Sequence, residues 1–136
     1  MIKTPVQVRF ADCDIAGHIH NAVYLHYFES GRIHFFVSQL GTNWDWKAQG
    51  IILKKNTIIY HSPGQITDQI VVEVTCTHIG ESSFTLGYKV INQENELRAE
   101  GESVLVCMDY TVGQIIQIPE SFLSILQEHL ISTDQA

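Results

Sequence analysis

Residues 9–32 read RFADCDIAGHIHNAVYLHYFESGR, and this stretch joins a loop rich in reactive side chains to the start of a long helix. Its second half repeats residues at the three- and four-residue spacing of one helix face, at Tyr24, Tyr27, Phe28, Gly31 and Phe35. Asn21 is of a type that caps helix starts, and Gly41 is of a type that ends helices. The sequence therefore predicts a helix of about 20 residues from Asn21 to residue 40.

Outward from this helix, apolar and polar residues alternate with the period of strands. One such segment, at 6–10, precedes the loop, and four longer segments follow the helix at 51–60, 70–77, 84–90 and 97–108. Short turns separate these strands, so we expect neighbouring strands to form antiparallel hairpins. Pro119 can start a last short helix.

This order of elements predicts an α+β domain that spans residues 1–136, in which one long helix covers a curled antiparallel sheet. Gly31 inside the helix costs up to about 1 kcal/mol relative to alanine, so we expect it where the helix approaches the sheet closely. In a monomer of this kind an edge strand and one sheet face stay poorly protected. The pattern therefore argues for a homodimer as the minimum assembly.

The composition excludes several classes of partner. The chain has 15 acidic and 8 basic side chains, a net charge of −7, and no cluster of Lys and Arg interleaved with aromatic residues. Nucleic acid is not expected, because neutralisation of phosphates dominates that affinity. No apolar run reaches the roughly 18 residues that cross a bilayer, and no signal-peptide pattern is present. Three well-separated cysteines fit neither a disulfide framework nor a zinc site, so we expect a cytoplasmic protein without membrane insertion.

The loop at 10–21 concentrates two carboxylates, a thiol and two imidazoles between a strand and a helix start. Acyl transfer requires a carboxylate that attacks or activates water, and N–H donors that hold the developing oxyanion. The unpaired backbone N–H groups at a helix start are donors of this kind. The loop therefore has both components of an acyl-transfer site.

The motif RFADCD at 9–14, followed by GHIHNAVY at 17–24 and by Tyr27, Glu29 and Arg32, resembles the signature of the 4-hydroxybenzoyl-CoA thioesterase-like branch of hot-dog proteins. The resemblance implies a hot-dog fold and hydrolysis of an acyl-CoA, without a metal ion or redox cofactor. It also implies active sites at a dimer interface and dimers that can pair into a homotetramer. The related pattern usually reads G-H-x-N-N, whereas His20 replaces its first Asn here, so substrate selection can differ.

The same resemblance assigns roles to individual residues. Asp14 is expected to be the nucleophile or general base, while a backbone N–H near Asn21 polarises the thioester carbonyl. His18 is expected to orient the loop or the attacking water. The expected substrate contacts are Gly17, Tyr24 beside the acyl group, and Ser82 and Ser83 near the pantetheine arm.

Other interpretations of these residues stay open. Asp14 can simply cap a turn, and Asp12 is expected to hold the loop through backbone N–H groups. Cys13 is a poor nucleophile, because the flanking carboxylates raise its pKa. A metal site would need a third ligand at familiar spacing, which is not clear from His18, His20 and His26. Glu29 and Arg32 are three residues apart on the helix and predict a surface ion pair.

Three other functions are alternatives to acyl-CoA hydrolysis. An acyl-carrier-protein thioesterase would use the same site with a different carrier. A hydratase or dehydratase on this fold resembles a different pattern, with its acidic residue on the helix and a separate His. A non-catalytic acyl-CoA binding protein would gain nothing from an unneutralised carboxylate beside a thioester carbonyl. The chain has no G-x-S-x-G motif, which argues against a serine hydrolase. The acyl group itself is not determined by the sequence.

Overall fold

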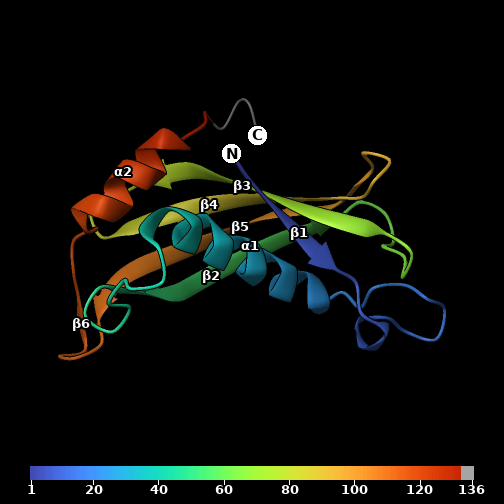
Figure 1. The fold of residues 1–136 in the computed structure, drawn as a ribbon, viewed down its shortest axis with the longest axis horizontal. Coiled ribbons are helices and arrows are strands. Elements are labelled where there is room, and N and C mark those ends of the chain that lie inside the picture. Colours follow the sequence, from blue (N-terminus) through green and yellow to red (C-terminus); the bar gives the residue numbers. More distant parts are fainter. Residues whose placement is uncertain (133–136) are drawn as a thin grey trace.

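The structure is a computed structural model and describes residues 1–132. Along the chain the elements are β1 (Ile2–Gln7), the 3-10 turn η1 (Phe10–Asp12), α1 (Val23–Leu40), β2 (Gly50–Tyr60), β3 (Gln69–Ile79), β4 (Ser83–Ile91), β5 (Leu97–Asp109), β6 (Gln114–Ile115) and α2 (Glu120–Glu128) (Figure 1). The strands form one antiparallel sheet in the order β1-β3-β4-β5-β2, and β6 pairs with the end of β5.

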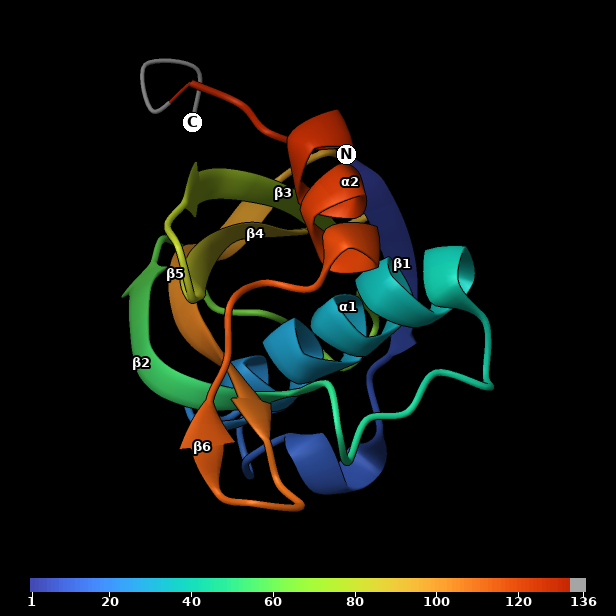
Figure 2. The same ribbon diagram turned by 90° about the vertical axis from the view of Figure 1, so that its left-hand side faces the viewer.

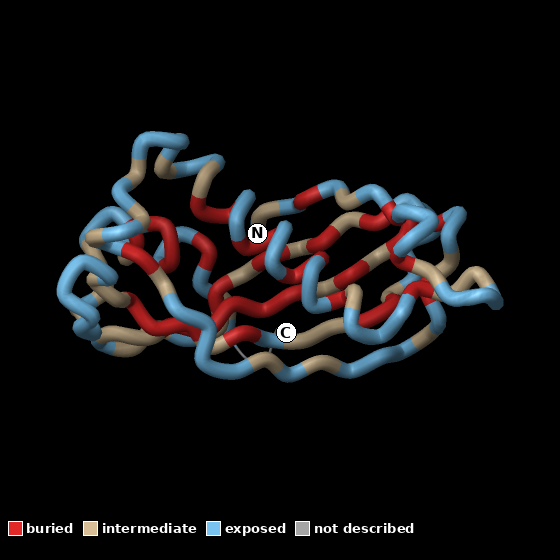
Figure 3. The backbone as a smooth tube through the Cα atoms, turned by 90° about the horizontal axis from the view of Figure 1, so that it is seen from below, coloured by how far each residue is buried: buried red, intermediate tan, exposed pale blue. Residues whose placement is uncertain are grey.

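The sheet curls around α1, which packs on β1, β3 and β4. Figure 2 shows β1 on one side of the helix and β2 on the other. Buried residues gather along the facing parts of α1 and the sheet, as the red segments of Figure 3 show. Phe28 of α1 stacks on Tyr88 of β4 with ring centroids 4.4 Å apart, and Phe122 of α2 stacks on Phe36 at 4.7 Å. The predicted α+β architecture is therefore confirmed.

The long helix largely follows the sequence prediction. It begins at Val23 rather than at Asn21, and no side chain caps its start. Gly41 ends it in the left-handed region, with φ +77°. A Cβ on Gly31 would lie 2.9 Å from Cγ2 of Val74 in β3, so the expected close approach to the sheet is confirmed. None of the helices within residues 1–132 is both long enough and apolar enough to cross a membrane.

The prediction of a strand at 6–10 was wrong at its end. β1 stops at Gln7, and Phe10 lies in η1 with 87% of its surface exposed. The Asp12 side chain accepts the backbone N–H of Arg9 at 2.9 Å. This bond takes a donor that a longer strand would have used in the ladder, so the chain turns away from the sheet.

The expectation that neighbouring strands form hairpins holds for β3, β4 and β5, but it was wrong for β2 and β3. β2 pairs with β5, and β3 pairs with β1 and β4. The segment at 61–68 carries the chain from the edge strand β2 to β3, which lies beside the opposite edge strand β1. The Arg98–Asp68 ion pair, with Nε and Oδ2 2.9 Å apart and both side chains buried, fixes the end of this segment. A local sequence pattern does not contain this long-range contact.

Candidate active site

Backbone hydrogen bonds fix the loop between η1 and α1. The Asp14 N–H donates to the His18 carbonyl at 2.9 Å, and the Gly17 N–H donates to the Asp14 carbonyl at 3.0 Å. Gly17 closes this turn with φ +79°, a conformation that favours glycine. The Ile19 N–H donates to the Gly64 carbonyl at 2.9 Å and ties the loop to the segment after β2. The position of Asp14 is therefore set by main-chain contacts on both sides.

The Asp14 side chain is exposed and uses one oxygen to close its own turn. Its Oδ1 accepts the N–H groups of Ala16 at 2.9 Å and of His18 at 3.1 Å. The hydrogen bond from His18, then that from Ala16, lowers the pKa of Asp14, and the nearby His18 and His20 side chains lower it further. The expected turn-capping role thus applies to Oδ1. Neither bond uses Oδ2, so an ionised oxygen stays open to a substrate.

The start of α1 presents backbone donors beside this carboxylate. The Val23 N–H is taken by the His20 carbonyl at 3.0 Å. Within residues 1–132, the N–H groups of Asn21 and Ala22 have no acceptor. Tyr60, the last residue of β2, donates its hydroxyl to the Asn21 carbonyl at 2.9 Å and so orients this turn. Free N–H groups at a helix start are suited to hold an oxyanion.

A hollow of about 560 Å³ opens at this end of α1. Its walls come from the loop, the helix start and the end of β2, through Asp14, His18, Ile19, His20, Asn21, Tyr24, Tyr60, His61, Ser62 and Pro63. The structure therefore brings four of the expected site residues, Asp14, His18, Asn21 and Tyr24, to one cavity. Gly17 adjoins this wall through His18.

Tyr24 forms the buried side of the hollow. Its hydroxyl accepts the Gly64 N–H at 3.1 Å, and its ring meets that of Tyr60 edge to face at 5.5 Å. A Cβ on Gly64 would lie 2.6 Å from the Tyr24 hydroxyl and 2.5 Å from Cδ1 of Ile19. Only a glycine lets the segment after β2 pack this closely, so Gly64 fixes the shape of the wall.

Asp12 has the structural role that the sequence predicted. Oδ1 of its buried carboxylate accepts hydrogen bonds from Nε and Nη2 of Arg9, and Oδ2 accepts the Arg9 backbone N–H and the Tyr27 hydroxyl, both at 2.9 Å. Burial alone would raise the pKa of Asp12, but these hydrogen bonds outweigh burial and hold the pKa below its usual range. Both oxygens are occupied, so Asp12 anchors the loop to α1.

The structure also bears on the alternative chemistries of the loop. Burial, and then the Asp12 and Asp14 carboxylates, raise the pKa of the Cys13 thiol, which disfavours the nucleophilic thiolate. His18 and His20 line the hollow, whereas His26 lies on the exposed surface of α1. No group of three potential metal ligands occurs in the described part of the chain.

Sequence reasoning missed the contribution of the end of β2. Tyr60 and His61 line the hollow, and His61 Nε2 lies 2.8 Å from Oε2 of Glu100 on β5. The alternating pattern and the turn residues marked where this strand ends. They carried no sign that the strand end returns to the start of α1, because this contact joins residues far apart in the chain.

Ser82 and Ser83 lie elsewhere in this subunit. Ser83 begins β4, and the Ser82 carbonyl accepts the Cys107 N–H at 2.8 Å. The turn between β3 and β4 is at the opposite end of β3 from the Asp14 loop (Figure 1). One chain therefore does not bring these serines to the hollow, and their contact with pantetheine stays a prediction that requires a second subunit.

The fold, together with the following relatives, makes this protein a thioester hydrolase of the hot-dog fold. The structure aligns with a thioesterase from Thermus thermophilus complexed with coenzyme A and Zn, with a TM-score of 0.80 and 28% sequence identity. The alignment covers 93% of this chain and 91% of that protein. The family model of the thioesterase-like superfamily matches residues 8–126, so the chain belongs to this superfamily.

Two relatives are named for different acyl carriers, CoA and acyl carrier protein. The acyl-CoA thioester hydrolase YbgC of Escherichia coli O6:H1 is 25% identical over 128 residues, which cover 91% of this chain and 94% of that protein. The chloroplastic acyl-acyl carrier protein thioesterase ATL3 of Arabidopsis thaliana is 28% identical over 128 residues, which cover 90% of this chain and 65% of that protein.

Proposed function

We propose that this protein hydrolyses an acyl-CoA to the free acid and CoA, and that Asp14 is its catalytic carboxylate. The observation that carries the proposal is that Asp14, whose Oδ2 is free, and Asn21, whose backbone N–H is free, line one hollow. In the reaction the carboxylate attacks the thioester carbonyl, or draws a proton from the water that does so. The free N–H groups then stabilise the negative oxygen, and the CoA thiolate leaves.

The proposal allows two routes, in which Asp14 acts as the nucleophile or as the general base. The hydrogen bonds that lower the pKa of Asp14 keep its carboxylate ionised near neutral pH, which both routes require. In the nucleophilic route Asp14 and the acyl group form a mixed anhydride as the CoA thiolate leaves. His18, which lines the same wall, would orient the water that hydrolyses this anhydride. A single turnover in heavy-oxygen water distinguishes the routes, because only the covalent route leaves the label in Asp14.

The decisive experiment measures thiol release from short, medium, long and aromatic acyl-CoA esters with the wild type and Asp14→Asn. Asp45→Asn is a matched control, because Asp45 Oδ1 also accepts two backbone N–H groups, both at 3.1 Å, in an exposed turn outside the hollow. We expect Asp14→Asn to lower kcat by about 10²-fold or more, and Asp45→Asn to be close to wild type. Equal losses of kcat in both variants would show that Asp14 only caps a turn and has no catalytic role.

The alternative carrier is tested with the same acyl group on CoA and on acyl carrier protein. The relatives support both carriers, but the YbgC alignment covers nearly the whole of both chains, which favours CoA. If only the carrier-protein ester is hydrolysed, the proposed substrate is wrong and the proposed site still stands. Tight CoA binding without turnover of any ester would favour the non-catalytic alternative.

The assembly is also proposed, as a homodimer formed through the free edge of β2. β2 has a long exposed edge with apolar Ile52 and Ile59 accessible, whereas the other edge strand, β1, is short and contains Pro5. Antiparallel pairing of β2 with its copy would extend the sheet. Light scattering on Ile59→Lys tests this contact, and an unchanged dimer would exclude it.

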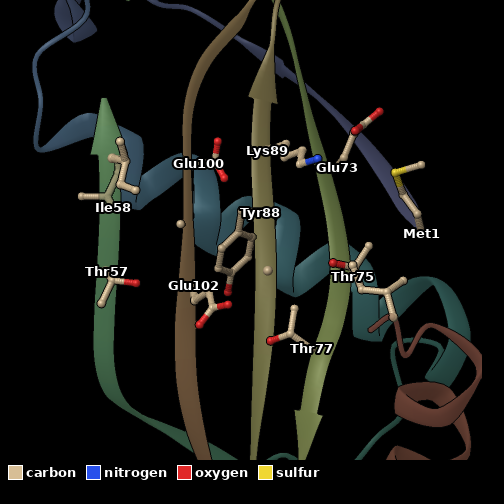
Figure 4. A pocket seen from close by; sticks show the side chains of 14 residues that line it. Met1, Thr57, Ile58, Glu73, Thr75, Thr77, Tyr88, Lys89, Glu100 and Glu102 are labelled. Carbon is tan, nitrogen blue, oxygen red and sulfur yellow. The ribbon is translucent and has the colours of Figure 1, made fainter. Parts of the chain in front are cut away.

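A homotetramer would use the outer face of the sheet. This face has a hollow of about 430 Å³, in which Lys89 stands between Glu73 and Glu100 on the neighbouring strands (Figure 4). Alternating charges of this kind can pair with a second copy across a two-fold axis. Lys89→Glu should therefore convert a tetramer to dimers without loss of the β2 contact.

The expected cytoplasmic location agrees with three cysteines that are all unpaired.

A further inference from the structure

A second hollow lies farther along the same helix, on the side of α1 that faces β2. Its volume is about 390 Å³, and it is lined by Glu29, Arg32, Ile33, Phe36, Val37, Trp46 and Ile51. Ile33 is 53% exposed here, although it lies in the middle of the central helix. The hollow at the helix start and this second hollow share no lining residue, but both lie between α1 and β2, with Tyr60 and Ile51 at opposite ends of the strand. A long acyl group that extends from the first hollow along α1 would reach the second one.

Arg32 is the exceptional residue of this apolar hollow. It makes the ion pair with Glu29 that the sequence predicted, but Arg32 itself is buried, with 8% of its surface exposed. Among residues 1–132 it donates one side-chain hydrogen bond, from Nη1 to the Tyr88 hydroxyl at 3.2 Å. The Glu29 carboxylate, half exposed, is 3.8 Å from Nη2, beyond hydrogen-bonding distance. Nε and Nη2 thus have no hydrogen-bond acceptor among residues 1–132, and since no buried side-chain nitrogen of these residues lacks a partner, both atoms are accessible to solvent.

Polar side chains hold Arg32 in place from below. The Tyr88 hydroxyl that accepts its hydrogen bond also interacts with the fully buried Ser103, which donates to the Asn56 side chain on β2. This row crosses from α1 to the edge strand under an otherwise apolar surface. A buried guanidinium left against a purely aliphatic ligand would be desolvated without compensation. Its planar fork of donors instead matches a carboxylate, which can bind both nitrogens at once.

We propose that this hollow binds the far end of the acyl group and that Arg32 selects acyl chains that end in a carboxylate. The substrate class would be monothioesters of dicarboxylic acids, and this inference rests on the proposed thioesterase function. Arg32 lies roughly 13 Å beyond Val23 along α1, from the 1.5 Å rise per residue. An extended chain advances roughly 1.2 Å per bond, so this separation corresponds to about eleven bonds from the thioester.

A change at Glu29 should affect turnover of carboxylate-ended substrates in the opposite direction to a change at Arg32. It is an exposed carboxylate in the same hollow, so it repels a substrate carboxylate and competes for Arg32. Removing its charge should therefore improve turnover of the proposed substrates, while removing the charge of Arg32 should impair it. A purely structural role for the Glu29–Arg32 pair predicts that both changes act in the same direction and on all substrates alike.

The experiment compares kcat/KM for pairs of acyl-CoA esters of equal length, one ending in a methyl group and one in a carboxylate. We expect the wild type to favour the carboxylate at the matching length by about tenfold or more. Arg32→Gln should abolish this preference, mainly through KM, and Glu29→Gln should raise it about threefold. Ser30→Ala, an exposed change on α1 outside the hollow, should leave the preference unchanged.

Folding and oligomeric state are measured for each variant by thermal unfolding and light scattering. If Arg32→Gln fails to fold, Glu29→Gln still decides the question. A wild-type preference for methyl-ended chains, or equal losses on both esters, would overturn the inference and leave Asp14-dependent hydrolysis standing. Dissociation of the dimer in Arg32→Gln with no change in preference would assign Arg32 to the subunit contact. Hydrolysis of no ester would overturn the proposed function, and this inference with it.

Discussion

Tyr60, at the end of the edge strand β2, donates its hydroxyl to the backbone carbonyl of Asn21 at 2.9 Å. This single contact joins the strand to the turn that presents the free N–H groups of the candidate site. It also places the tyrosine ring against Tyr24, with centroids 5.5 Å apart. The orientation of the proposed oxyanion donors thus depends on a residue far from the loop in sequence.

Tyr60→Phe should lower kcat/KM because the turn at Asn21 loses its anchor, while the ring still packs on Tyr24. The hydrogen bond is half exposed, so we expect stability to fall by no more than about 1 kcal/mol. Tyr110→Phe is the matched control. Its hydroxyl makes the same type of bond, to the Ile51 carbonyl at 2.7 Å, at the other end of β2. Equal effects of the two changes on kcat/KM would show that Tyr60 has no special relation to the site.

Gly31→Ala should destabilise the protein although alanine favours helices. The gain in helix propensity is about 1 kcal/mol, but the new methyl would lie 2.9 Å from Val74 and 3.0 Å from Val72. Forcing the helix from the sheet costs about 1–3 kcal/mol, so a net loss is expected in urea unfolding. Ser30→Ala, on the exposed side of α1, should be neutral or slightly stabilising. A more stable Gly31→Ala protein would contradict the close packing.

The Asp68–Arg98 pair should make stability depend on pH in the acid range. Burial raises the pKa of Asp68, but hydrogen bonds from Arg98, Gln65 and Asn92 outweigh it and lower the pKa overall. The unfolded chain therefore binds a proton more readily, and the contribution is complete above the usual Asp pKa of about 3.9. It is lost as pH falls from there through the lowered folded-state pKa. Urea unfolding of the wild type should show this loss.

Asp68→Asn tests the same pair at neutral pH. The change removes the buried charge partner of Arg98 and leaves only the half-exposed Glu96 carboxylate, 3.8 Å away. Breaking a buried pair costs about 3–5 kcal/mol, so we expect a loss toward the lower end of this range. The variant should also lose part of the acid dependence seen in the wild type. Asp109→Asn is a suitable control, since the Asp109 carboxylate also has a lowered pKa, but hydrogen bonds from Thr111 cause it rather than an arginine. The same acid profile in wild type and Asp68→Asn would contradict the assignment.

Cys13→Ala should retain activity. The thiol lies between Asp12 and Asp14, and burial together with these two carboxylates raises its pKa, so little thiolate forms at neutral pH. Its alkylation by iodoacetamide should accordingly be slow compared with that of a free thiol, measured by mass spectrometry. A loss of turnover as large as that of Asp14→Asn, in a folded Cys13→Ala protein, would move the catalytic role to the thiol.

The sequence alone determined the elements that depend on local patterns. The periods of 3.6 and two residues identified α1 and the four long strands, Gly41 marked the helix end, and Gly31 indicated the close approach to the sheet. The motif from Arg9 to Tyr24 identified the loop that carries Asp14, because residues adjacent in the chain make that loop. The structural role of Asp12 could be distinguished from the catalytic role proposed for Asp14 for the same reason.

Only the tertiary structure decided which distant residues complete the site. The pairing of β2 with β5 brings Tyr60 and His61 to the start of α1, and the curl of the sheet buries Arg32 beside Tyr88. These contacts arise from packing between segments that are far apart in sequence. Hydrophobic periodicity determines which face of an element is buried, but the partner against which that face is buried depends on the fold as a whole.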